Sequence, residues 1–82
     1  MAESENLPTA HTEVDASGLK CPLPILRAKK ALAQMETGEV LKVITTDPHA
    51  ARDFQAFCTQ TGNALLAQAE QGDAVWHFLR RR

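Results

Sequence analysis

The architecture of this chain is encoded most clearly in residues 18–46, GLKCPLPILRAKKALAQMETGEVLKVITT. From Pro22 to about Glu36 the apolar residues recur at helical spacing, at Ile25, Ala28, Ala31, Leu32 and Met35. Proline suits the first helical turn, because the amide hydrogen that it lacks would be unpaired there. Gly38 is expected to close this helix with a left-handed cap. Residues 39–46 are apolar and β-branched, which predicts a central strand.

Working outward from this stretch, turn residues and periodicity define the remaining elements. They are a first strand at 11–16, a second helix from Asp47-Pro48 to about Thr61, and strands at 64–70 and 74–81 joined by a hairpin at 71–73. The order is βαβαββ, and a chain of this length cannot cover both faces of a sheet with helices. We therefore predict an α/β fold, a two-layer α/β sandwich in which two helices cover one face of a four-stranded mixed sheet. Residues 1–10 are expected to be a flexible leader to a domain at 11–82.

Composition excludes several classes of protein. Apolar residues make up 44% of the 82 residues and charged residues 23%, which is ordinary for a soluble globular domain. A net charge of −1 argues against stable nucleic-acid binding, and no apolar run approaches the roughly 18 residues that span a bilayer. Two distant cysteines form neither a disulfide framework nor a metal-ligand pair. We expect a cytoplasmic monomer without metal or cofactor and without membrane contact.

The candidate catalytic residue is Cys21, which lies where the first helix is expected to begin. A thiolate at the N-cap would be stabilised by the free amides and the helix dipole, so its pKa is expected below the usual value of about 8.5. Lys20 would add a positive charge beside it. The residues expected to support this helix start are Gly18, Lys20, Pro22, Leu23 and Pro24. Together they predict a cysteine nucleophile that needs no general base.

Other ionisable residues receive simpler interpretations. Cys58 shares a helix face with Phe54 and Phe57, so it is expected to be a core residue. Asp47 is interpreted as a helix cap and Asp53 as a surface charge. The sequence shows no pattern that would assign a catalytic role to any of the three histidines, His11, His49 and His77.

Two groups of cations carry alternative interpretations. Arg27, Lys29 and Lys30 form either a solvated helix face or a docking patch for an acidic partner. The closing residues Arg80–Arg82 are expected to fray, although contact with an acidic partner or tRNA is the alternative.

The motif around Cys21 also resembles a known signature. Residues 15–24, DASGLKCPLP, resemble the Cys-Pro-x-Pro motif of the TusA/SirA-like sulfur carriers, and the likeness continues at residues 35–39, 46–48, 52–53 and 57–58. The resemblance implies a sulfurtransferase-like carrier that holds a persulfide on Cys21. Sulfur would come from a cysteine desulfurase or a rhodanese-type donor and pass to a downstream sulfur-relay protein. In the best-known branch this relay serves tRNA 2-thiouridine synthesis.

One position departs from that branch, which often has glutamate where this chain has Leu23. The departure leaves the acceptor open, so a carrier for dissimilatory sulfur metabolism is an alternative. A regulatory or interaction module of the same fold, with an idle cysteine, is another. A thiol redox protein would need a resolving cysteine near Cys21, and the sequence lacks that spacing.

Overall fold

The computed structural model describes residues 7–82, so most of the predicted leader lies outside the described residues. The elements follow the predicted order: β1 (Thr12–Ala16), α2 (Leu23–Ala33), β2 (Val40–Thr45), α3 (Ala50–Thr61), β3 (Ala64–Gln71) and β4 (Ala74–Arg80). Each lies within a few residues of its predicted bounds. The βαβαββ order is therefore confirmed.

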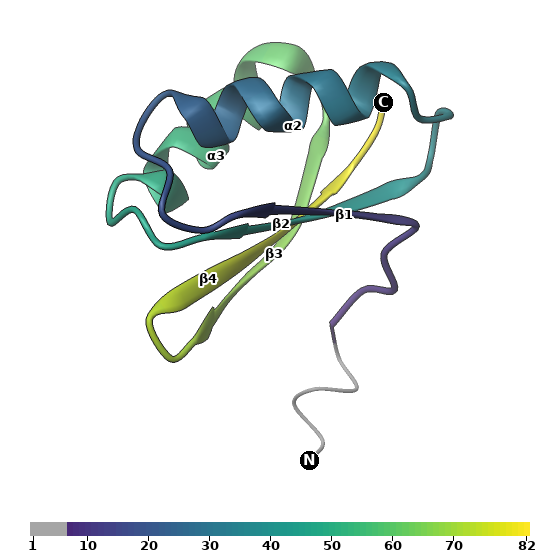
Figure 1. The fold of residues 1–82 in the computed structure, drawn as a ribbon. Coiled ribbons are helices and arrows are strands. Elements are labelled where there is room, and N and C mark those ends of the chain that lie inside the picture. The colour runs from purple at the N-terminus through teal and green to yellow at the C-terminus, as the bar shows by residue number, and fades with distance from the viewer. Residues whose placement is uncertain (1–6) are drawn as a thin grey trace.

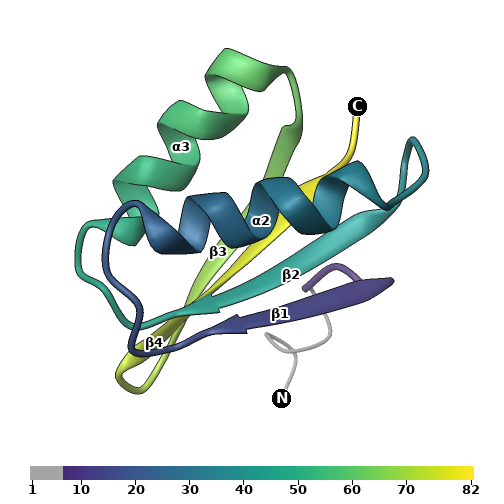
Figure 2. The same cartoon turned by 45° about the horizontal axis from the view of Figure 1, so that its top comes forward.

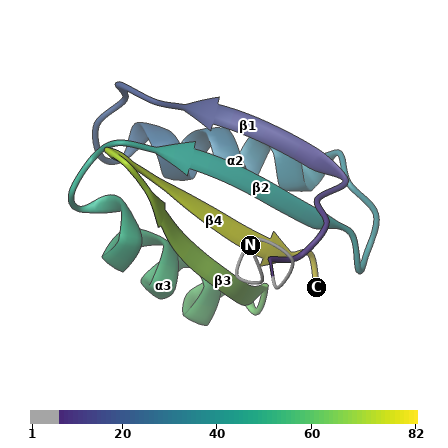
Figure 3. The same cartoon turned by 90° about the horizontal axis from the view of Figure 1, so that it is seen from below.

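The strands form one mixed sheet in the order β1-β2-β4-β3. β1 pairs parallel with β2, whereas β2 with β4 and β3 with β4 pair antiparallel. Both helices cover the same face, α2 over β1 and β2 and α3 over β3 and β4 (Figures 1 and 2). Seen from the other side, the sheet lies in front of both helices (Figure 3). The predicted two-layer sandwich and the central position of β2 are confirmed.

The core fills the space between the sheet and the two helices. Its buried apolar members include Leu32, Leu41, Val43, Phe54, Phe57, Cys58 and Leu79. Alternation along β2 sends Leu41 and Val43 into the core, and the 3.6-residue period of α3 does the same for Phe54 and Cys58. The predicted apolar faces of both helices are thus confirmed.

A histidine is part of this core. His77 is fully buried and stacks on Phe54 with 4.6 Å between ring centroids. Its Nε2 lies 2.7 Å from the Thr45 hydroxyl, and its Nδ1 lies 3.1 Å from the Gln68 amide nitrogen. Burial lowers the pKa of His77 to about 4, so the ring is neutral near neutral pH. These contacts give His77 a structural role.

Helix α2 ends earlier than predicted, whereas α3 ends where expected. α2 stops at Ala33, and Gly38, with φ 90°, lies in the turn that follows the helix. The Glu39 carboxylate accepts the Glu36 amide at 3.0 Å and stabilises this turn before β2. The prediction that Gly38 caps the helix is therefore wrong. At the end of α3, by contrast, Gly62 is the left-handed cap with φ 84°.

The last residues of the chain are anchored. The Gly38 amide donates to the Arg81 carbonyl at 2.8 Å, and the Arg81 amide donates to the Glu39 carbonyl at 2.9 Å. The Arg82 amide donates to Asn63 Oδ1 at 3.0 Å. The expectation that these arginines fray is wrong, because hydrogen bonds to two different turns hold their backbone.

The face of the sheet opposite the helices carries the chain's tryptophan. The Lys42 ammonium lies 3.5 Å from the Trp76 ring centroid and 3.5 Å from a Glu13 carboxylate oxygen. Residues 7–10 border a hollow beside Trp76 on this face. Neither helix within residues 7–82 is long and apolar enough to cross a membrane.

Candidate functional site

Two loops meet where the parallel strands β1 and β2 end. The loop after β1 carries Cys21, and the loop after β2 carries Thr46 and Asp47. The Gly18 amide donates to Thr46 Oγ1 at 2.8 Å, and the Cys21 amide donates to Asp47 Oδ2 at 2.8 Å. The cysteine loop is therefore held by side chains 26 and 28 residues further along the chain.

Gly18 is required by the path of this loop. Its φ is 80°, which side-chain-bearing residues rarely adopt, whereas a Cβ there would meet no atom within 4 Å. The Leu19 amide donates back to the Ala16 carbonyl at 3.2 Å and closes the turn. The supporting role predicted for Gly18 therefore has a conformational basis.

Cys21 lies just outside helix α2. Pro22 occupies the N-cap position, with φ −100° and ψ 18°, and no side chain caps the helix. The Leu23 amide, at the start of the helix, donates instead to the Lys20 carbonyl at 2.8 Å, and Pro24 is buried in the first turn. The prediction that the Cys21 sulfur caps the helix is wrong, because the chain reaches the helix one residue later than expected.

The charges nearest the sulfur are negative. A hydrogen bond from the Cys21 thiol to Asp53 raises the pKa of Cys21, and desolvation and the charges of Asp53 and Asp47 add to the increase. The predicted lowering of this pKa by the helix dipole and Lys20 is therefore wrong. The raised pKa favours the protonated thiol at this exposed sulfur, and the Asp53 carboxylate borders the same depression.

Asp47 connects the two loops and stays ionised. Its side chain is only 6% exposed, and its Oδ1 accepts the His49 amide at 3.1 Å and lies 3.2 Å from His49 Nδ1. Hydrogen bonds from the His49 and Cys21 amides lower the pKa of Asp47. The prediction that Asp47 caps the second helix is wrong, because α3 begins at Ala50 with His49 at its N-cap and no side chain caps it; Asp47 instead accepts the His49 amide in the turn before the helix.

A shallow depression lies beside the sulfur. It has a volume of about 240 Å³ and is bordered by Cys21, Pro22 and Ile25 on one side and by Asp53, Phe57 and their α3 neighbours on the other. Leu23 and Leu26 flank this end of α2 and are 47% and 50% exposed. The sulfur is thus accessible, with one carboxylate in reach and exposed leucines nearby.

The second cysteine has a different environment. Cys58 is buried among the core residues of α3, and burial raises the pKa of its thiol. The expectation that Cys58 is a core residue is confirmed.

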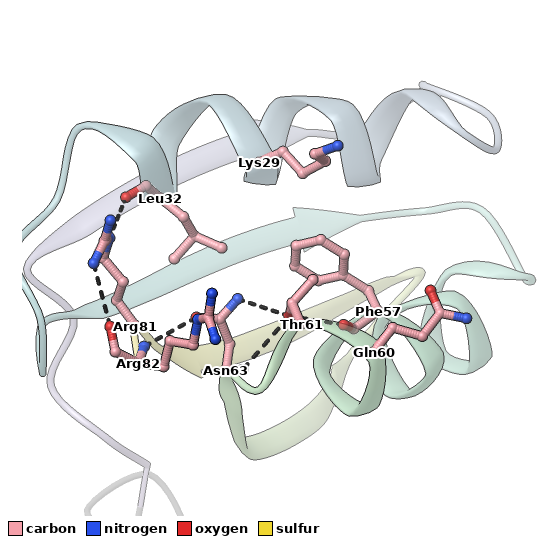
Figure 4. A pocket seen from close by; sticks show the side chains of 8 residues that line it. All are labelled: Lys29, Leu32, Phe57, Gln60, Thr61, Asn63, Arg81 and Arg82. Carbon is pink, nitrogen blue, oxygen red and sulfur yellow. Dashed lines mark hydrogen bonds between the residues drawn. The ribbon is translucent and has the colours of Figure 1, made fainter.

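The predicted cationic cluster is divided between two places. Lys29 borders a hollow between α2, α3 and the chain end (Figure 4). Arg27 and Lys30 border another hollow, beside Val14 of β1. One helix face therefore does not present all three charges to a single partner.

Sequence reasoning missed the part that Asp47 and Asp53 play at the sulfur. Helical spacing places Asp53 on the surface of α3, and nothing local in the sequence connects it with a cysteine 32 positions earlier (53 − 21). The available signal was the likeness to the sulfur carriers, which extends over residues 46–48 and 52–53.

Comparison with known proteins gives a consistent result. The family model described as sulfurtransferase TusA matches residues 12–82. The chain is 57% identical over 70 residues to the sulfur carrier protein TusA of Allochromatium vinosum, covering 85% of this chain and 91% of that protein. It is 39% identical over 69 residues to the sulfur carrier protein TusA of Pseudomonas entomophila, covering 84% and 86%.

A solved structure shows the same fold. The crystal structure of the SirA-like protein from Desulfitobacterium hafniense superposes with a TM-score of 0.76 at 28% identity. The match covers 84% of this chain and 95% of that one.

Proposed function

The chain belongs to the TusA family of sulfur carriers, and we propose that Cys21 is the residue that carries the sulfur, as a persulfide. The observation that supports this most directly is the contrast in access between the two thiols. Cys21 is exposed in a depression that Asp53 also borders, whereas Cys58 is buried in the core. Only an accessible thiol can meet a donor protein's persulfide.

In the loading step the Cys21 sulfur attacks the outer sulfur of a donor persulfide, R–S–SH. A bond forms between the two sulfurs, the S–S bond of the donor breaks, and the products are Cys21–S–SH and the donor thiol. The proton lost by Cys21 ends on the donor sulfur, so no oxidant or reductant is required.

We assign the movement of that proton to Asp53. Asp53 borders the same depression as Cys21, and it is the main cause of the raised pKa of that thiol, which puts a carboxylate base within reach of the thiol proton. Asp53 would take the proton as the new S–S bond forms and return it to the leaving donor sulfur. This replaces the expectation that no general base is needed, because that expectation depended on a thiolate stabilised by the helix.

Family membership supports sulfur-relay partners in general, and the specific partners are part of this proposal. The donor is a cysteine desulfurase or a rhodanese-type protein, and the acceptor is a downstream sulfur-relay protein, in a pathway such as tRNA thiolation. The exposed Leu23 and Leu26 supply apolar docking contacts beside the sulfur. Both thiols are free, as in proteins of a reducing compartment, which supports action in the cytoplasm. The carrier is proposed to act as a monomer.

Intact mass measurement tests this assignment. After incubation with a cysteine desulfurase and cysteine, we expect the protein to gain the mass of one sulfur atom, removable by a reductant. Cys21→Ser should prevent the gain, and Cys58→Ser should retain it. A sulfur adduct that persists in the Cys21→Ser protein would contradict the assignment of Cys21, and no adduct on the unaltered protein would favour an idle cysteine in an interaction module.

A further inference from the structure

A second hollow lies further along the furrow between the two helices. It has a volume of about 410 Å³, and its charged border consists of Lys29, Arg81 and Arg82 (Figure 4). Among the residues that border it within the described chain, none is an aspartate or glutamate, and none of the three cations pairs with an aspartate or glutamate side chain within residues 7–82. We call this hollow the basic pocket.

One of its guanidinium groups is held in place, and a second cation has an anchored backbone. The Arg81 Nε donates to the Leu32 carbonyl at 2.7 Å, and its Nη1 lies 3.2 Å from the main-chain oxygen of Arg82. The Arg82 backbone is held by Asn63, and its exposed side chain lies over Gly62, where an added Cβ would be 3.3 Å from Arg82 Cδ. The held guanidinium of Arg81 loses little conformational freedom on binding an anion, and it has donors left for it.

The basic pocket adjoins the depression at Cys21. Phe57 and Gln60 border both hollows, so the two form the ends of one furrow between α2 and α3. Asp53 makes the end at the sulfur negative, and Lys29, Arg81 and Arg82 make the other end positive. A ligand that fits the whole furrow must carry a nucleophilic sulfur at one end and an anion at the other.

We propose that the basic pocket binds a carboxylate side chain of the acceptor protein while that protein's reactive cysteine lies against the Cys21 persulfide. The proposal depends on the proposed carrier function and adds the charge that the acceptor must present. The acceptor thiol attacks the outer sulfur of Cys21–S–SH, the S–S bond to Cys21 breaks, and the proton that the acceptor thiol loses ends on Cys21, so the products are the acceptor persulfide and the Cys21 thiol. The carboxylate takes no part in this chemistry and positions the cysteine.

The furrow sets the spacing between the two groups of the acceptor. From Leu23, beside the sulfur, to Leu32, beside the basic pocket, α2 advances by about 13 Å at roughly 1.5 Å per residue. An extended segment covers that length in about four residues at roughly 3.3 Å each. We therefore expect the acidic residue about four positions from the acceptor's cysteine.

Charge favours a protein segment over RNA as the occupant. A nucleic acid would place phosphates along the entire furrow, including the end where Asp47 and Asp53 lie. The chain as a whole carries a net charge of −1. A protein segment with a single carboxylate near its cysteine can pair that carboxylate with the cations of the basic pocket, and it places no further anion beside Asp53.

The test measures sulfur transfer to synthetic peptides. Cys21 is first loaded by glutathione persulfide in the Cys58→Ser background, and the loaded protein is mixed with nine-residue peptides that contain one cysteine. One peptide has glutamate four positions from the cysteine, a second has glutamine there, and a third has glutamate next to the cysteine. At low salt the first should accept sulfur about fivefold faster than the other two, as expected for a specific ion pair.

Charge-reversal variants inside and outside the basic pocket show whether the peptide preference comes from this pocket. Arg82→Glu and, separately, Lys29→Glu should remove the preference for the glutamate peptide and leave transfer to the glutamine peptide unchanged. Arg80→Glu is the matched control, because it makes the same charge change on an exposed side chain outside the basic pocket. Arg80→Glu should retain the preference. Lys29 is exposed on a helix, so its variant remains informative if Arg82→Glu fails to fold.

Two results would overturn the proposal. One is equal transfer to all three peptides by the unaltered protein. The other is a preference for glutamate that persists in both pocket variants. Binding of a labelled RNA hairpin at physiological salt that both pocket variants abolish, without any peptide preference, would assign the pocket to RNA instead. Failure of glutathione persulfide to load Cys21 would contradict the carrier function itself and is therefore distinguishable from these results.

Discussion

The two cysteines of this chain have pKa values raised for different reasons. Around Cys21 the cause is negative charge, because Asp53 accepts a hydrogen bond from the thiol and Asp47 lies nearby. Around Cys58 the cause is the loss of water among the core residues of α3. The first environment can be changed by a partner or a mutation, whereas the second changes only if the fold opens. A raised pKa alone therefore does not separate a reactive cysteine from a structural one.

The largest expected difference between the two thiols is their rate of alkylation. Iodoacetamide should modify Cys21 readily at pH 8.5. The alkylation rate of Cys58 should be lower by a factor of about a thousand or more, because exposure of this side chain requires unfolding. Peptide mapping by mass spectrometry over a time course measures both rates in one sample. In denaturant the two rates should converge. Equal rates in the native protein would show that Cys58 is not a core residue.

Replacing each cysteine by serine should affect the free energy of unfolding differently at the two positions. Cys58→Ser should lower the free energy of unfolding by about 1–3 kcal/mol, because a hydroxyl in the core lacks a hydrogen-bond partner. Cys21→Ser, at the surface, should change it by no more than about 0.5 kcal/mol. Chemical denaturation of both variants under reducing conditions gives the two values. Similar losses in the two variants would remove the distinction between a surface and a core cysteine.

Removal of the carboxylate at the sulfur should make Cys21 more reactive. Asp53→Asn eliminates a negative charge next to the thiol, so the pKa of Cys21 should fall, and a larger fraction should be thiolate at pH 7.5. Alkylation at that pH should become several-fold faster, and the two proteins should react alike well above the pKa. Transfer from a protein persulfide should slow, because Asp53 no longer takes the proton.

Asp73→Asn provides the control, since Asp73 is an exposed acid in the β3–β4 hairpin. It should leave the pH profile of Cys21 alkylation unchanged. A profile that is also unchanged in Asp53→Asn would mean that this carboxylate does not set the state of the sulfur.

The smallest effect is expected from a new charge near the sulfur. Leu23→Glu adds a carboxylate to an exposed position two residues from Cys21, which should raise the Cys21 pKa further and slow alkylation at pH 7.5 by about twofold, because solvent screens the charge. Leu66→Glu, at another exposed leucine, should have no effect on this rate. Faster alkylation of the Leu23→Glu protein would contradict the role given to negative charge here.

The fold was predictable because its signals are local. The periodicity of residues 25–35, the glycine at position 62 and the hairpin residues at 71–73 each act within one or two turns of the chain. The two-layer arrangement then follows from the number and order of the elements. Burial of Cys58 was predictable for the same reason.

The chemistry of the site was less predictable because it depends on distant contacts. Cys21 was recognisable from its motif, but the sign of its pKa shift was not. The deciding groups, Asp47 and Asp53, come from the β2–α3 loop and from α3, and only the folded chain brings them to the sulfur. The anchoring of Arg81 likewise depends on Leu32, 49 residues away.

The position of Trp76 has a consequence for spectroscopy. This residue is the chain's only tryptophan, and it lies on the sheet face opposite the helices, with the Lys42 ammonium over its ring. Its emission therefore reports on the integrity of the sheet and on that cation, so it is a suitable signal for melting curves. The furrow that contains Cys21 lies on the other side of the sheet. Partner binding there is expected to leave the tryptophan spectrum unchanged, so titrations need a dye attached near α2 or α3.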